Sequence, residues 1–544
     1  MLAQRTGRGM IQKKEFPSRI ALLLKAALIV AAGAWAHAPA LHGEWLRDWD
    51  DATEVTGNTL LREPGALRRI WLNPGTPDYL PLKTTAQWIE WHLWQDRAVA
   101  YHAVNIALHL LGALLLWRLL GRLGVRMAWL GGLFFAVHPL AVESVAWLSE
   151  FKNVLSLPFL LLAATAFIDH ETSRSRTAYV LSVLCFLASM LCKSSGVMLP
   201  VVLLAHAWWR RGRVSRDDLV SSLPFLAISL ALGLVSLHFQ RHLMAINREF
   251  PGPEGPVARL AVAGTAALFY GFKCLWPFGL SPVYPRWNLA HPALWRVAGP
   301  WLVIAVSAAW LCRGKAPWRR GTLFSLGCFG LFLVPVLGFV PMTYFRITWV
   351  ADHFAYLPLA CVAGLAAAAA GVILRPGVSS RPGNALAGIA VAAVIAILAL
   401  SSRGYSRVFR DEETLWSRTV SENPGAWIAH ANLSDIRLAQ GRVPEAETEI
   451  RAALLLEPRV AASHNNLGNI LSRTGRLEEA VAEYEAALRL NSRLPEVYFN
   501  LGDALFNLHR YSEAARRYGE GLRLSPDYAP GRAHLSLALS RAAR

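Results

Sequence analysis

The sequence predicts an all-α protein: a polytopic membrane helix bundle with about eleven spans, followed by an α-solenoid. Three observations carry this prediction. Hydrophobic side chains make up 54% of the 544 residues and charged ones only 17%, whereas a soluble domain carries about 25% charge. Apolar stretches close to the length of a membrane span recur throughout residues 1–402. The remainder of the chain repeats itself at a fixed interval.

Charge separates the two parts. Residues 403–544 balance 19 Arg against 18 acidic side chains, so the positive excess lies in residues 1–402. It collects between apolar stretches, as in the cytoplasmic loops of membrane proteins. This distribution indicates a lipid bilayer, and not nucleic acid, as the partner. The six cysteines lie in or beside apolar stretches without a CxxC pair, which supports neither a disulfide framework nor a zinc site.

The first span is expected at 20–40, after a basic segment with Arg5, Arg8, Lys13 and Lys14 that places the N-terminus in the cytoplasm. Its length favours an uncleaved helix over a signal peptide. A polar loop, 41–98, then lies outside. The other candidate spans are 99–120, 127–147, 153–169, 178–192, 196–209, 219–238, 258–280, 298–312, 321–342, 354–373 and 385–402.

The segment 258–280 decides on which side the chain ends. If it crosses, twelve spans return the C-terminal part to the cytoplasm. If it is re-entrant or lies along the outer surface, eleven spans leave that part outside. Eleven is favoured because the densest basic loop, RGKAPWRR at 313–320, is then cytoplasmic.

The C-terminal part has a 34-residue period. Leu467-Gly468, Ala480, Tyr484 and Ala487 recur as Leu501-Gly502, Ala514, Tyr518 and Gly521. This is the tetratricopeptide (TPR) pattern, in which small residues let two helices touch. We expect a connector and half repeat at 403–426, repeats at 427–460, 461–494 and 495–528, and a closing helix to 544.

TPR solenoids bind peptides or proteins on a concave face, so a protein acceptor or partner is expected there. Bracing of the membrane part is the alternative role. The repeats should stack mainly on themselves, so that removal of the chain after about Ser402 leaves the membrane part stable.

Ionisable side chains are costly in apolar helices and usually face a bundle interior. The candidates that hold a donor phosphate or support the site are His102, Asn105, His138, Lys152, Asn153, Lys193, Arg346 and His353. Most fall near the outer face, and Arg346, Asp352 and His353 join them only in the eleven-span arrangement. Hydrogen bonding between helices is the simpler role for His102, and snorkelling is the simpler role for Lys193.

Three carboxylates are the candidate catalytic residues. Asp50 and Asp51 form an acidic pair in the outer loop, and Glu143 lies in an apolar segment where an unpaired carboxylate is costly. A loop carboxylate could serve as general base for an acceptor hydroxyl or hold a divalent cation. A solvated loop pair is the alternative interpretation.

Several motifs resemble one family. They are WDD in the outer loop, YHAVNIALH, FFAVHPLAVESVAWLSEFKNVLS, LCKSSGVMLP, GLSPVYP and ADHFAYLP, followed by the TPR repeats. Over nearly the whole chain they resemble the transmembrane-and-TPR family of protein O-mannosyltransferases, in the GT-C glycosyltransferase superfamily, and above all its bacterial relatives. Phe151 and His353 stand where Arg is common in that family.

The resemblance implies a multi-pass protein of the bacterial inner membrane with periplasmic TPRs. It implies transfer of a mannose-like sugar from a polyprenyl-phosphate donor to a protein hydroxyl, with Asp50 and Asp51 as the catalytic element. Lys152 and Lys193, with His353 or Arg346, would stabilise the lipid-phosphate leaving group. The alternative is a non-catalytic membrane scaffold whose TPRs recruit partners. A transporter is disfavoured because no pair of broken helices stands in matching halves.

Overall fold

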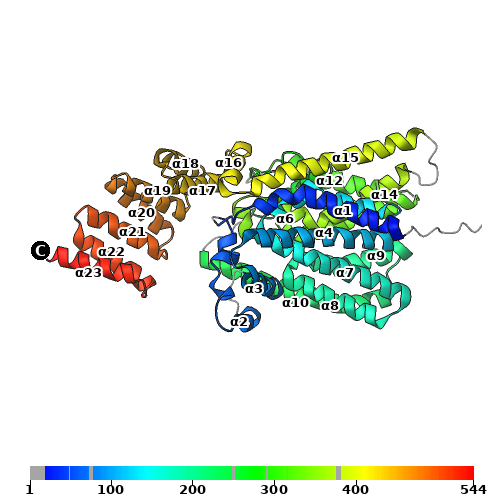
Figure 1. The fold of residues 1–544 in the computed structure, drawn as a ribbon, viewed down its shortest axis with the longest axis horizontal. Coiled ribbons are helices and arrows are strands. Elements are labelled where there is room, and N and C mark those ends of the chain that lie inside the picture. The colour runs from blue at the N-terminus through cyan, green and yellow to red at the C-terminus, as the bar shows by residue number, and fades with distance from the viewer. Residues whose placement is uncertain are drawn as a thin grey trace, which may run out of the picture.

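The computed structural model describes residues 19–47, 49–72, 78–247, 252–253, 255–289, 292–314, 316–374 and 382–544. The predicted cytoplasmic residues Arg5, Arg8, Lys13 and Lys14 lie outside these ranges. Within them all regular structure is helical, with no strand, which confirms the all-α prediction. Figure 1 shows a helix bundle and a curved helical array that follow one another along the longest axis of the molecule.

Every predicted apolar stretch contains a helix. The bundle helices are α1 (Arg19–His37), α4 (Ala98–Arg122), α5 (Ala128–Ala136), α6 (Val142–Ala146), α7 (Phe151–Ser173), α8 (Arg176–Cys192), α9 (Leu199–Arg211), α10 (Arg216–Asn247), α11 (Gly255–Leu275), α12 (Leu294–Cys312), α13 (Pro317–Leu333), α14 (Tyr356–Ile373) and α15 (Pro382–Ser406).

The number of long spans is lower than predicted. Among the described residues, eight helices are long and apolar enough to cross a membrane, and nine if a bent pair counts as one span. The expected spans at 178–192, 196–209 and 321–342 form helices of only 17, 13 and 17 residues. The membrane bundle is therefore confirmed, and by length and composition alone eight or nine of the described helices qualify as spans.

Prolines interrupt two of the predicted spans. Segment 127–147 is bent by 56° between α5 and the helical turns that begin at Pro139. In segment 321–342, α13 ends at Leu333 and a 3₁₀ turn that contains Pro335 follows. Proline has no N–H to donate and restricts the residue before it, so neither segment continues as one straight helix.

The basic loops gather at one end of the bundle. Arg122, after α4, pairs with Asp169 near the end of α7 at 3.1 Å. Arg320, at the start of α13, donates to the carbonyl of Trp208 in α9. The loop 313–320 therefore lies at the same end as the loops 118–126, 170–176 and 210–216.

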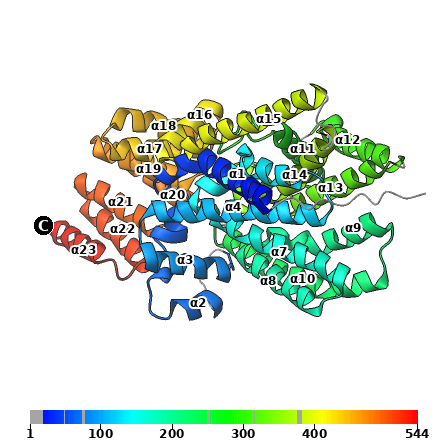
Figure 2. The same cartoon turned by 45° about the vertical axis from the view of Figure 1, so that its right-hand side comes forward.

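The outer loop and the solenoid lie at the opposite end, where α2 (Ala66–Leu72) and α3 (Pro81–Trp94) also lie in both views (Figures 1 and 2). Gln240 near the end of α10 donates to Asp78 of the outer loop at 2.7 Å. After α11, the carbonyl of Val283 accepts from Asn423 of the solenoid at 3.1 Å. The chain is thus at this end both before and after α11, as in the arrangement in which 258–280 does not cross.

The solenoid is built of helical hairpins. Its helices are α16 (Glu412–Glu422), α17 (Trp427–Ala439), α18 (Val443–Leu456), α19 (Ala461–Arg473), α20 (Leu477–Leu490), α21 (Pro495–Asn507), α22 (Tyr511–Leu524) and α23 (Ala529–Ala542). Gly468 and Gly502 permit the close approach within two hairpins, because a Cβ at either would lie 2.6 and 2.5 Å from the rings of Tyr484 and Tyr518.

An aromatic cluster, which we call the seam, joins the solenoid to the bundle. The ring of Trp49 stacks on Trp147 with centroids 3.9 Å apart and lies 5.0 Å from Trp416 of α16. Phe409 and Leu415 are wholly buried in the same cluster. The segment 403–426 is therefore not a mere connector. The packing gives a reason to expect the opposite of a harmless cut after Ser402, because truncation there removes half of the residues of this hydrophobic core.

Two truncations should consequently behave differently. A chain that ends at Ser402 uncovers Trp49 and Trp147 and should aggregate, whereas a chain that ends at Val460 keeps the seam and should stay monodisperse. Size-exclusion chromatography of the detergent-solubilised proteins distinguishes them. Equal, monodisperse profiles would show that the seam contributes little to stability.

Candidate active site

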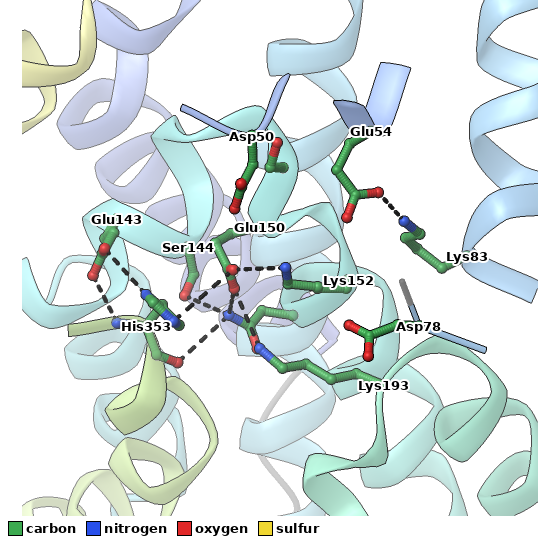
Figure 3. A network of polar contacts seen from close by, with 12 residues as sticks. Asp50, Glu54, Asp78, Lys83, Glu143, Ser144, Glu150, Lys152, Lys193 and His353 are labelled. Atoms are coloured by element: carbon green, nitrogen blue, oxygen red, sulfur yellow. Dashed lines mark hydrogen bonds and ion pairs between the residues drawn. The ribbon is translucent and has the colours of Figure 1, made fainter. Parts of the chain in front are cut away.

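A buried carboxylate, Glu150, lies at the centre of a polar cluster at the outer end of the bundle (Figure 3). Its oxygens lie 3.0 Å from Lys152 Nζ and 3.2 Å from Lys193 Nζ. Asn153 Nδ2 also donates to Glu150. Glu150 is 2% exposed, and a carboxylate so buried is costly unless cations and donors surround it. The sequence places Lys152, Asn153 and Lys193 among the candidate residues, and the structure brings all three together.

Glu143 and His353 form the second half of the cluster. The backbone N–H of His353 donates to Glu143 Oε2 at 2.8 Å, and His353 Nδ1 lies 3.1 Å from Glu143 Oε1. His353 Nε2 faces Glu150 at 4.0 Å. The α6 turn and the segment before α14 are therefore held together, and Glu143 orients the imidazole. This pair explains how Glu143 is accommodated in an apolar segment.

The two adjacent aspartates point in different directions. Asp51 is wholly buried. It accepts from Leu46 N at 2.8 Å, Ser149 N at 2.9 Å and Ser149 Oγ at 2.5 Å. Burial raises the pKa of Asp51 to about 7, although these hydrogen bonds act in the opposite direction. Asp51 therefore pins the outer loop onto the turn before α7.

Asp50 is half-buried, and its side chain points toward Glu150 and Lys152 (Figure 3). Among the described residues its carboxylate makes no hydrogen bond or ion pair. Burial raises the pKa of Asp50, and the ammonium of Lys152 acts in the opposite direction. A carboxylate with free lone pairs beside paired lysines can accept a proton from a bound ligand.

The outer loop adds charged residues that are not among those predicted from the sequence. Glu54 pairs with Lys83. Burial raises the pKa of Glu54, but Lys83 and Lys152 outweigh it and hold the pKa below its ordinary value. Asp78 faces the cluster from a second part of the loop (Figure 3). In the sequence, the only sign of a role for Glu54, Lys83 and Asp78 was that they lie in the charged outer loop.

Glu150 is likewise not among the predicted site residues. Its sequence signal was its place in SEFKN, two residues before Lys152. Asp352, one residue before His353, is held by two tyrosines, with Tyr284 Oη at 2.7 Å and Tyr405 Oη at 3.1 Å. These contacts fix the backbone of the segment that carries His353.

Two predicted supporting residues make contacts within the scaffold. Asn105 donates to the carbonyl of Val145 at 3.4 Å. His138 Nδ1 accepts from Leu140 N at 3.2 Å, and its Nε2 bonds the carbonyl of Cys274 at 3.1 Å. Because both ring nitrogens are engaged, His138 is a link between α5 and α11 and is not free to bind a phosphate.

His102 and Arg346 are also placed apart from the Glu150 cluster by their contacts. The ring of His102 packs on Gly43, where a Cβ would lie only 2.6 Å from Nε2. The Arg346 guanidinium lies over Trp427 of the solenoid, 5.2 Å from the ring centroid. The role predicted for Arg346 at the donor phosphate thus has no support from these contacts. Phe151 is buried in the bundle core.

In the ranges that the structure describes, no group of three or more His, Cys, Asp and Glu side chains is arranged to hold a metal. The cluster contains the Asp50 carboxylate, the ammonium groups of Lys152 and Lys193, which share the Glu150 carboxylate, and the His353 imidazole beside Glu143. Ammonium groups each have three donors, so Lys152 and Lys193 retain donors for an anionic ligand. The cluster can therefore bind a phosphate ester and remove a proton from a hydroxyl.

Comparison with protein families agrees with this chemistry. Residues 80–239 match the family dolichyl-phosphate-mannose-protein mannosyltransferase. Residues 413–454, 468–509 and 495–528 match tetratricopeptide repeat families. The mannosyltransferase match spans the last third of the outer loop and the segments that carry Glu143, Glu150, Lys152 and Lys193.

Individual curated proteins match most of the chain. The chain is 23% identical over 444 residues to a protein O-mannosyl-transferase of Caenorhabditis elegans, covering 75% of this chain and 60% of that one. It is 25% identical over 466 residues to protein O-mannosyl-transferase TMTC4 of Mus musculus, covering 72% and 61%. The chain thus spans about three fifths of these relatives.

Among solved structures, the chain is similar to the MamA protein, with 15% identity, a TM-score of 0.23, and coverage of 24% of this chain and 72% of that one. It is also similar to the TPR protein YrrB, with 16% identity, a TM-score of 0.22, and coverage of 31% and 82%. By these matches the chain is similar to the protein O-mannosyl-transferases over most of its length, with a mannosyltransferase family match in its membrane part and TPR matches after that part.

Proposed function

We propose that this protein is an integral-membrane glycosyltransferase that moves a mannose-like sugar from a polyprenyl-phosphate donor to a protein hydroxyl. The observation that carries the proposal is the Asp50 carboxylate, which has no partner among the described residues and points into the cluster of Glu150, Lys152 and Lys193. A base next to donors for an anion is the arrangement that sugar transfer from a phosphate carrier needs.

Asp50 is the proposed general base. It takes the proton of the acceptor hydroxyl while the hydroxyl oxygen attacks the anomeric carbon, and the bond from that carbon to the carrier phosphate breaks. Direct attack gives inversion at the sugar. Asp51 is excluded from this role because three hydrogen bonds from Leu46 and Ser149 occupy its carboxylate.

Lys152 and Lys193 are the proposed donors to the leaving phosphate. Both side chains are 18% exposed and are held by Glu150, so their positions are set before the donor binds. Preorganised cations stabilise charge that develops in the transition state without the cost of reorganising water. His353, oriented by Glu143, would supply a further donor on the same side.

An apolar cavity supports a lipid-linked donor. It lies between α4, α7, α9, α13 and α14, and is lined by residues such as Leu120, Leu161, Val202 and Phe332. Leu357, also in its lining, is one helical turn from His353. The cavity is small, about 120 Å³, so it could take only the part of a polyprenyl tail that lies next to the phosphate.

The proposed orientation puts the cluster and the solenoid on the non-cytoplasmic side, which is the periplasm in a bacterial inner membrane. It rests on the basic loops at the other end of the bundle. The solenoid would recruit the protein acceptor or another partner beside the acidic loop. A non-catalytic scaffold is the competing function, favoured by Phe151 at a position where the family commonly has Arg.

The Asp50→Asn variant tests the base. It keeps the shape of the side chain but removes the proton acceptor, so transfer should fall by ~10²–10⁴-fold. The measurement is transfer of mannose from polyprenyl-phosphate-mannose to a hydroxyl-bearing peptide by protein in membranes. Glu63→Gln, the same change on the rim of the outer loop, should keep wild-type activity. Equal activity of both variants would show that Asp50 is not the base, and absence of transfer in the wild type would favour the scaffold.

The pH dependence of transfer should follow Asp50. Only the ionised carboxylate accepts a proton, and burial raises its pKa. The rate should therefore fall as the pH drops through this raised pKa and reach a plateau above it. A pH–rate profile of the wild type, with Glu63→Gln as control, checks the direction. A flat profile over the acid range in which the protein stays folded would contradict the assignment.

Asp51→Asn should mainly destabilise the fold. The amide offers one oxygen for the Ser149 donors and turns an N–H₂ toward Leu46 N, which leaves a buried donor unsatisfied at a cost of ~1–3 kcal/mol. Thermal unfolding in detergent should show a lower Tm for Asp51→Asn than for Asp50→Asn, whose carboxylate has no protein partner to lose. The reverse order would mean that the two roles are exchanged.

A further inference from the structure

An arginine-rich cavity lies at the outer ends of α1 and α15. It has a volume of about 340 Å³ and is lined by Ala38, Pro39, His42, Arg403, Arg407 and Arg410. The three arginines are spaced four and three residues apart, so they project on one side of the chain as α15 passes into the next turn. No acidic side chain is among the lining residues.

The three guanidinium groups are not equally engaged. Arg410 pairs with Asp411 at 3.0 Å. Arg403 donates to the carbonyl of Trp35 at 2.6 Å and lies over its ring, 4.7 Å from the centroid. Arg407 is exposed and makes no ion pair with any described residue. Two positive charges therefore face the cavity without a carboxylate partner among the residues that the structure describes.

The cavity lies where lipid headgroups meet the protein. The helices below it expose large apolar side chains, with Leu28 at 48%, Ile397 at 50% and Leu400 at 61%. Trp35, 45% exposed on the same surface, is the residue type that marks the boundary between hydrocarbon and headgroups. Arginine binds phosphate with paired N–H donors. A phosphate that reaches this cavity from the bilayer thus meets both charge and donors.

We propose that this cavity binds the phosphodiester of an anionic phospholipid of the outer leaflet. The site faces away from the proposed catalytic cluster, because Tyr405, between Arg403 and Arg407 in the sequence, turns the other way and donates to Asp352 at 3.1 Å. The bound headgroup would hold the ends of α1 and α15 together at the point where the chain enters the seam. This proposal does not depend on glycosyltransferase activity.

Lipid binding by the full chain tests the proposal. The purified protein in detergent is titrated with phosphatidylglycerol and, separately, with phosphatidylcholine, and bound lipid is counted by native mass spectrometry. Arg407→Gln removes one uncompensated charge at an exposed position, so the fold should survive. It should weaken phosphatidylglycerol binding by about tenfold, the loss expected for one charged hydrogen bond. Arg68→Gln, an exposed arginine of α2 outside the cavity, is the matched control and should bind as the wild type does.

The other outcomes overturn the proposal. Unchanged binding in Arg407→Gln, or an equal loss in Arg68→Gln, would mean that the cavity is not the binding site. Equal affinity for phosphatidylcholine would remove the preference for an anionic lipid. Displacement of phosphatidylglycerol by an equal concentration of inorganic phosphate would show that a free phosphate, and not a lipid, is the ligand.

Discussion

The burial of Glu150 constrains everything at the outer end of this bundle. A carboxylate that is 2% exposed loses its hydration, and the loss is offset only where cations and donors replace the water. Lys152 and Asn153 come from the start of α7, Lys193 from the end of α8, and His353 from the segment before α14. The ion pairs and hydrogen bonds that the Glu150 carboxylate requires therefore bring three segments of the chain together and form the polar cluster.

The seam extends this constraint to the solenoid. Trp49 precedes Asp50 directly, and its ring is held between Trp147 of the bundle and Trp416 of α16. Asp51, which follows Asp50, is tied to Ser149 next to Glu150. Asp50 is thus fixed on both sides by neighbours that belong to the core. The direction of the Asp50 carboxylate therefore depends on the same packing that attaches the TPR helices to the bundle.

The acidic pair illustrates how far local reasoning reaches. Two neighbouring carboxylates in a loop are chemically alike in the sequence, and only their opposite directions are foreseeable. Ser149 and Leu46 donate to Asp51, so the fold holds that residue, and Asp50 is the one that we propose as the base. Similarly, His138 looks like a site residue in an apolar stretch, but Cys274, far away in the chain, supplies the carbonyl that engages it.

Local patterns of residues were enough to predict three features of this protein. Apolar stretches predict the helices, small residues at a fixed spacing predict the 34-residue repeats, and charged residues between apolar stretches predict that the basic loops gather at one end. It also indicated Lys152, Asn153 and Lys193, since polar groups in apolar helices require partners. The partners of the polar groups follow only from tertiary packing. Glu150 is the carboxylate that both lysines share, Glu143 pairs with His353, and Arg346 packs against Trp427 of the solenoid. Such pairings depend on how helices far apart in the chain pack, and no local pattern encodes them. The seam arose in the same way, from contacts that form once the bundle closes, whereas the interruptions at Pro139 and Pro335 follow from proline itself.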